Sequence, residues 1–85
     1  MDQSEIARRA SALPDRFAAR VPPETLESLR LMDEGGEYGE LTIELAATLA
    51  KTKAAVSIAE RDELLALLEA MTMPTNPIDM LKVHD

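Results

Sequence analysis

Acidic side chains and glycines are concentrated in the stretch Asp33–Glu40, whose sequence is DEGGEYGE. These eight residues hold four carboxylates, all three glycines of the chain and its only tyrosine. Carboxylates at this density could hold a metal ion or meet a basic protein, and closely spaced glycines could cradle a phosphate. The segment is therefore the first candidate for a functional site.

Phosphate and calcium binding both require neighbours that this stretch lacks. A phosphate-binding loop follows a strand and ends in Gly-Lys-Ser or Gly-Lys-Thr, and the surrounding carboxylates would repel a phosphate. A calcium loop needs oxygen ligands at alternate positions and a closing glutamate, for which eight residues are too few. We therefore expect a turn between two helices, with acidic side chains that can face a protein partner.

Catalytic and cofactor-binding arrangements are not evident elsewhere. The chain has no cysteine, its single histidine is His84 near the end, and its serines and threonines have no nearby base. Carboxylates on a helix surface lack the burial that raises a pKa for acid catalysis. We predict that the protein is not an enzyme and has no catalytic residue, no cofactor and no metal.

Composition favours a single all-α domain over residues 1–85. Apolar residues make up 46%, and they are mainly Ala, Leu and Met, which form helices, with almost no aromatic or alternating strand-like runs. The N-terminus lacks the pattern of a secretory signal, and no apolar run approaches the ~18 residues of a membrane span. We expect a soluble, cytoplasmic protein.

Start and stop signals predict a compact bundle of about four helices with a short C-terminal flap. We expect the flap to fold Ile78 and Leu81 over the core, and residues 1–2 and 82–85 to be frayed. A helix rich in alanine on one flank, predicted over residues 37–51, should lie centrally. The first predicted helix is Gln3–Leu13, capped by Ser4, and Pro14–Arg20 continues it with Phe17 as a core anchor. A second helix runs from Pro23 to Gly35 and a third covers Glu37–Lys51. The fourth, Ser57–Met71, begins with a capping box formed by Ser57 and Glu60.

The negative charge is uneven along the chain. Residues 24–44, here called the acidic segment, hold seven acidic residues against Arg30 alone, whereas residues 1–21 have a net charge of +1. The overall charge of −7 disfavours nucleic acid and anionic membranes as partners and favours a basic protein. A solvated helix face is the alternative, because like charges on one helix stripe cost only a few tenths of a kcal/mol per pair. The candidate partner-binding residues are Glu24, Glu27, Asp33, Glu34, Glu37, Tyr38, Glu40 and Glu44.

The order of these signals over about residues 13–71 resembles the small helical immunity proteins of bacterial polymorphic toxin systems. The likeness is to the MafI type, related in style to immunity proteins of contact-dependent inhibition. It is carried by a helix ending at Gly36-Glu37, a helix with Glu37, Leu45 and Leu49, and a Ser57-capped helix ending at Met71.

This resemblance implies a protein that is monomeric when free and that binds and neutralises one toxin domain, often a nuclease with a basic cleft. The carboxylates would then meet Lys and Arg of the toxin. Tyr38 would either anchor the contact or simply cover the turn. The alternative is a small helical scaffold or adaptor that acts through protein–protein contacts or dimerisation, which an exposed leucine stripe would favour.

Overall fold

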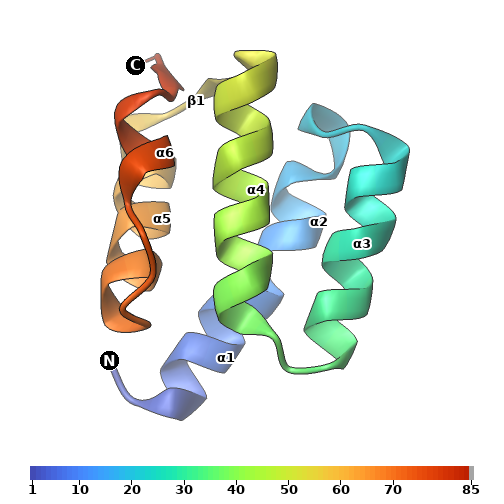
Figure 1. Cartoon of the computed structure of the whole chain (residues 1–85), viewed down its shortest axis with the longest axis vertical. Coiled ribbons are helices and arrows are strands. Elements are labelled where there is room, and N and C mark those ends of the chain that lie inside the picture. The colour runs from blue at the N-terminus through green and yellow to red at the C-terminus, as the bar shows by residue number, and fades with distance from the viewer. Residues whose placement is uncertain (85) are drawn as a thin grey trace.

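Helix α4 (Tyr38–Thr52) lies at the centre of the molecule and contacts α1, α3, α5 and α6 (Figure 1). The computed structural model describes residues 1–84, which are mostly helical and include two strands of two residues each. The helices are α1 (Gln3–Ser11), α2 (Leu13–Phe17), the 3-10 turn η1 (Ala18–Arg20), α3 (Pro23–Glu34), α4, α5 (Ile58–Ala70) and α6 (Asn76–Asp79). The predicted all-α bundle is confirmed, as is the central position of α4.

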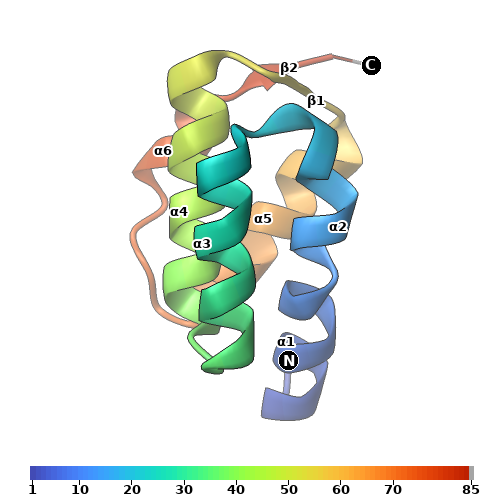
Figure 2. The ribbon, with the colours of Figure 1, turned by 90° about the vertical axis from the view of Figure 1, so that its right-hand side faces the viewer.

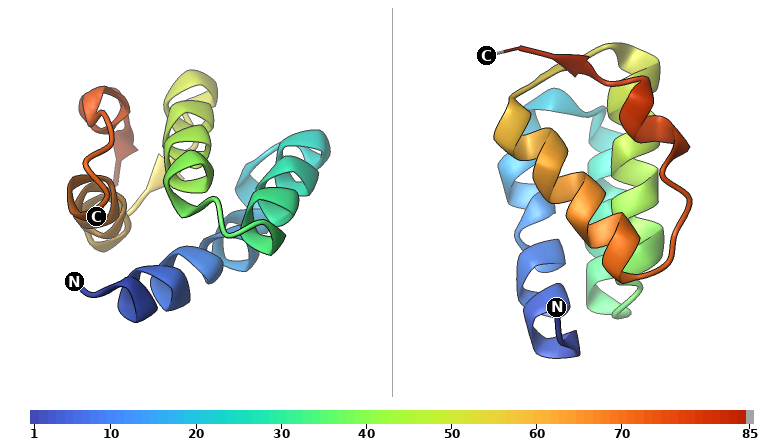
Figure 3. Two further views of the ribbon diagram at one scale, coloured as in Figure 1. Left: turned by 60° about the horizontal axis from the view of Figure 1, so that its bottom comes forward. Right: turned by 90° about the vertical axis from the view of Figure 1, so that its left-hand side faces the viewer.

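The N-terminal helices run along one side of α3, α4 and α5 (Figures 2 and 3). Because α1 begins at Gln3, Asp2 and not the predicted Ser4 is its cap, and the Asp2 carboxylate accepts a 2.8 Å hydrogen bond from the Glu5 backbone N–H. Pro14 lies in the first turn of α2, as predicted, since only a donor that would be unpaired is lost there. Phe17 is 1% exposed and anchors this segment in the core.

The turn between α3 and α4 depends on Gly36. This glycine has a left-handed backbone with a φ of +69°, which glycine adopts without the steric penalty that a Cβ would bring. The backbone N–H of Glu37 donates to the Met32 carbonyl at 2.8 Å, and that of Gly36 donates to the Asp33 carbonyl at 3.0 Å. These two bonds satisfy the last carbonyls of α3 and reverse the chain, so that α3 and α4 lie side by side and antiparallel.

Leucines from every longer helix except α1 form the core. Leu29 of α3, Leu45 of α4 and Leu64 of α5 are fully buried. Thr42 is buried as well, and its hydroxyl donates to the Tyr38 carbonyl at 2.8 Å, so the core holds no unsatisfied hydroxyl there. The full set of core residues is Leu13, Phe17, Leu29, Leu41, Leu45, Ala46, Leu49, Val56, Leu64, Leu67, Leu68, Ile78 and Leu81.

The C-terminal part closes over this core. The predicted capping box at the start of α5 is confirmed, with both reciprocal bonds between Ser57 and Glu60 present. Ile78 and Leu81 are buried, as the predicted flap requires. Two short strands, β1 (Ala55–Val56) and β2 (Lys82–Val83), pair in parallel and were not predicted. Residues 82–84, expected to fray, are thereby tied to the segment that enters α5, while Asp85 lies outside the described residues.

Truncation of the core should be costly in so small a domain. Leu45→Ala should lower the free energy of unfolding by about 2–5 kcal/mol, because it leaves a cavity beside α4. The control Leu31→Ala, at a side chain that is 61% exposed, should change it by less than about 0.5 kcal/mol. Urea denaturation followed by circular dichroism measures both values, and equal losses would show that Leu45 is not a core residue.

The two glycines of the turn should respond differently to a methyl group. Gly36→Ala should destabilise by about 1–2 kcal/mol, because an L-residue is strained at positive φ. Gly35→Ala is the matched control, since its backbone is right-handed and its Cβ would meet no atom closer than 3.5 Å. Thermal unfolding of the two variants compares them, and a destabilised Gly35→Ala with an unaffected Gly36→Ala would contradict this account.

Candidate functional site

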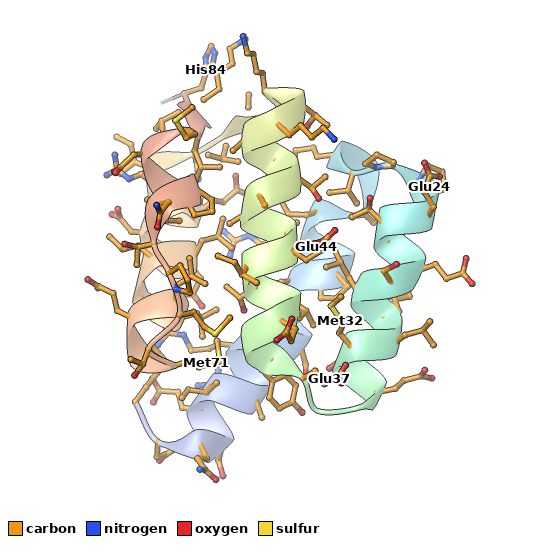
Figure 4. The ribbon with its side chains drawn as sticks, in the orientation of Figure 1. Glu24, Met32, Glu37, Glu44, Met71 and His84 are labelled. Atoms are coloured by element: carbon orange, nitrogen blue, oxygen red, sulfur yellow. The ribbon has the colours of Figure 1, made fainter. Side chains whose placement is uncertain are left out.

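Six glutamates of the acidic segment are exposed on α3, α4 and the turn between them. Glu37 and Glu44 lie along the border of α4 with α3, and Glu24 lies at the opposite end of α3 from the turn (Figure 4). Because the two helices are antiparallel, the carboxylates extend along the length of the pair. We call this set the acidic face; it consists of Glu24, Glu27, Glu34, Glu37, Glu40 and Glu44.

Asp33 and Tyr38 differ from the other candidate residues in being partly buried. The Asp33 carboxylate accepts a 2.6 Å hydrogen bond from the Ser11 hydroxyl and so links α3 to α1. Asp33 therefore has a partner inside the molecule. Tyr38 begins α4 and lines a hollow together with residues of α1 and the end of α5.

The N-terminal arginines pair with acidic residues of α5 and not with the acidic face. Arg9 binds Glu63, with a 2.8 Å bond from its Nε, and also contacts Glu5 of its own helix at 2.8 Å. Arg20 donates two 2.7 Å hydrogen bonds to the Glu60 carboxylate. These contacts join the first helices of the chain to α5.

Glu60 is the most enclosed of these carboxylates, with a side chain that is 11% exposed. It receives Arg20, lies 3.4 Å from the Arg16 Nε and completes the α5 capping box. The hydrogen bonds from Arg20 lower the pKa of Glu60 to about 2, against the opposing effect of burial. The hydrogen bonds from Arg9 likewise lower the pKa of Glu63, so both carboxylates are charged at neutral pH.

The acidic face is left without internal counterions. Within residues 1–84, no Lys or Arg nitrogen lies within 4.0 Å of a carboxylate oxygen of its six glutamates. Arg30, the only cation in the acidic segment, is directed to Asp15 of α2 at 2.9 Å. The negative potential of the acidic face is therefore available to a partner outside the molecule.

A hollow next to Tyr38 was not predicted from the sequence. It lies where α1, the turn before α4 and the end of α5 meet, and its volume is about 760 Å³. The hollow is here called the Tyr38 groove. Its lining is mixed, with the polar Gln3 and Ser4 beside Met1, Ile6, Tyr38, Gly39, Ala70 and Met71. Met71 is partly buried against the core and also lines the groove. Figure 4 shows Met71 and Glu37 on opposite sides of the first turn of α4.

Comparison with known proteins gives no relative for this chain. No family model, curated protein or solved structure matches it. In the described residues, no helix combines the length and the apolar character that a membrane crossing needs. Over the same residues, no group of three or more His, Cys, Asp or Glu side chains is placed to hold a metal ion.

The ion pairs at Glu60 predict how stability depends on pH. The pKa of Glu60 is lower in the folded chain than its ordinary value of 4.5, so its contribution is complete above that value and is lost as the pH falls towards 2. Glu60→Gln should lower stability at neutral pH by about 1–2 kcal/mol, allowing for the solvent around both arginines. It should also make the loss of stability below about pH 5 less steep.

Chemical denaturation at a series of pH values measures this effect. Glu69→Gln is the matched control, because Glu69 lies on the same helix, is exposed and has no ion pair among the described residues. The control should keep the pH dependence of the original protein. An unchanged slope in Glu60→Gln would show that this carboxylate is not linked to acid unfolding.

Proposed function

We propose that this chain is an immunity-type inhibitor that binds one cationic toxin domain through the acidic face and so neutralises it. The observation that carries the proposal is the distribution of ion pairs. Arg9, Arg16 and Arg20 are engaged by glutamates, whereas the six glutamates of the acidic face have no cationic partner among residues 1–84.

Such a surface is suited to rapid capture of a basic domain. Fields from several carboxylates add over a screening length of about 8 Å at physiological salt, and they raise association rates by roughly 10- to 1,000-fold for a partner of opposite charge. The carboxylates are already exposed, so a cationic cleft can meet them without unfolding any part of the bundle. Nuclease toxins have clefts of this kind, because they must bind phosphates.

The resemblance to MafI-type immunity proteins supports the same proposal and supplies its particular form: a cytoplasmic protein, monomeric when free, with a single toxin domain as its partner. The scaffold or dimer alternative receives less support from the surface. Among the described residues, the exposed large apolar side chains are Met1, Leu31, Ile58, Met80 and Val83, which come from separate parts of the chain and include a single leucine.

The direct test uses the gene next to the one that encodes this chain. We expect it to encode a large secreted protein with a variable C-terminal domain. Expression of that domain should arrest growth, co-expression of this chain should restore it, and the two purified proteins should form a complex with one copy of each. Continued arrest together with the absence of a complex would overturn the proposal.

Charge reversal on the acidic face should slow this association. Glu40→Lys combined with Glu44→Lys should reduce the association rate constant by about ten-fold or more at low salt, with little change in the melting temperature. The matched control is Asp62→Lys combined with Asp79→Lys, which changes the net charge equally on α5 and α6, where both aspartates are exposed.

Surface plasmon resonance at low and physiological salt measures both rate constants. The association rate constant of the control should fall by about three-fold or less, because only the long-range effect of net charge changes. An equal fall of the association rate constant in the two double variants would show that the location of the charge is unimportant and that the acidic face is not the interface.

A further inference from the structure

The Tyr38 groove shares a turn of chain with the acidic face. Gly36, Tyr38 and Gly39 line the groove, while Glu37 and Glu40 alternate with them in the sequence and are exposed. One end of the molecule thus presents a hollow that is lined in part by apolar side chains, directly beside carboxylates that have no cationic partner in the described part of the chain.

The floor of the groove is continuous with the core. Ile6 and Met71 are partly buried and pack against the core cluster, so they form a fixed apolar surface below the opening. At Gly36 a Cβ would meet nothing within 4 Å, which leaves that side of the groove open to an incoming group. Met1 is 47% exposed on the other side and offers a flexible thioether that can adapt to an apolar guest.

We infer that the Tyr38 groove receives an apolar side chain, aromatic or leucine-like, from a basic segment of the protein partner, while lysines or arginines that flank this side chain meet Glu37 and Glu40. The inference rests on the proposed function and adds its anchoring site. Interfaces commonly derive most of their affinity from a few apolar or aromatic contacts in a pocket, and charged rims mainly set the rate of association and the specificity.

Charge complementarity is what selects this occupant. In a symmetric pair of copies joined through this groove, Glu37 and Glu40 of one copy would lie near the same residues of the other, and like charges would oppose the contact. Two cationic groups adjoin the groove, the amino group of the lining residue Met1 and the exposed Arg8 next to the lining residue Ala7. A neutral apolar ligand would leave the carboxylates unused, whereas a basic segment satisfies both the hollow and its rim.

The test is a titration of the full-length ¹⁵N-labelled protein with three short peptides, followed by amide chemical shifts at low salt. The probes are acetyl-Lys-Lys-Phe-Lys-Lys-amide, the same peptide with a central glycine, and acetyl-Ser-Ser-Phe-Ser-Ser-amide. The lysine peptide with phenylalanine should bind at least about ten-fold more tightly than either of the others. It alone should shift the amides of Tyr38, Gly39 and Met71, and the glycine peptide should shift only amides of the acidic face.

A blocked groove provides the matched variant. Ala70 is exposed at the last position of α5 and lines the groove, so Ala70→Trp should fill it and reduce the binding of the phenylalanine peptide to that of the glycine peptide. Ala59→Trp, at an exposed alanine near the other end of the same helix, should leave the ten-fold difference intact. Tyr38→Ala should weaken the binding of the lysine peptide with phenylalanine and leave the binding of the glycine peptide unchanged.

The outcomes separate the groove from the acidic face. If the two lysine peptides bind equally and shift only the acidic face, the groove inference is overturned while the proposed function stands. If the serine peptide binds as tightly as the lysine peptide with phenylalanine, the inference of a basic partner segment is overturned. If the amide shifts depend on protein concentration in the absence of peptide, the groove binds a second copy of this chain, and the inference is overturned as well. If neither lysine peptide shifts the acidic face at low salt, the proposed function itself fails.

Discussion

The pairing of N-terminal arginines with glutamates of α5 is the interaction on which the arrangement of charge depends. Arg9 and Arg20 each reach more than 35 residues along the chain, to Glu63 and Glu60, and both carboxylates have lowered pKa values as a result. These pairs hold α1 and η1 against α5. The two arginines are thereby paired within the molecule.

Glu60 combines two structural tasks in one side chain. Its carboxylate accepts the backbone N–H of Ser57 and thereby caps α5, and the same group receives Arg20. A capping glutamate at a helix start is also favoured by the helix dipole, so charge, cap and ion pair all stabilise the ionised form. The acidic face has none of these internal contacts, and the modest repulsion among exposed carboxylates is tolerated by a fold whose stability comes from its leucine core.

The turn at Gly36 connects the two surfaces that we assign to partner binding. Its left-handed backbone reverses the chain, sets Glu37 at the start of α4 and brings Tyr38 towards α1 and the end of α5. The turn thus places the hollow directly beside its charged rim. In the proposed complex, both surfaces would already be in place before association, so little conformational freedom would be lost.

Local signals in the amino-acid sequence were sufficient for the helices and for the burial of Phe17, Ile78 and Leu81. Proline at the start of α2, the capping box of α5 and the glycine stop of α3 each act over a few residues. The clustering of acidic residues in residues 24–44 is likewise evident from the sequence alone. The cap at Asp2 was misplaced because Asp2 and Ser4 are both good capping residues and lie two positions apart.

Contacts between distant segments could not be read from such signals. Nothing in the local sequence separates Asp33, which meets Ser11, from its exposed neighbour Glu34, and nothing pairs Arg20 with Glu60. The parallel strands at residues 55–56 and 82–83 are too short to show a period, and the Tyr38 groove is formed by three segments that adjoin only after packing. Helices and charge content follow from neighbours in the chain, whereas ion-pair partners and hollows depend on which helix faces meet, and the packing of the whole core determines that.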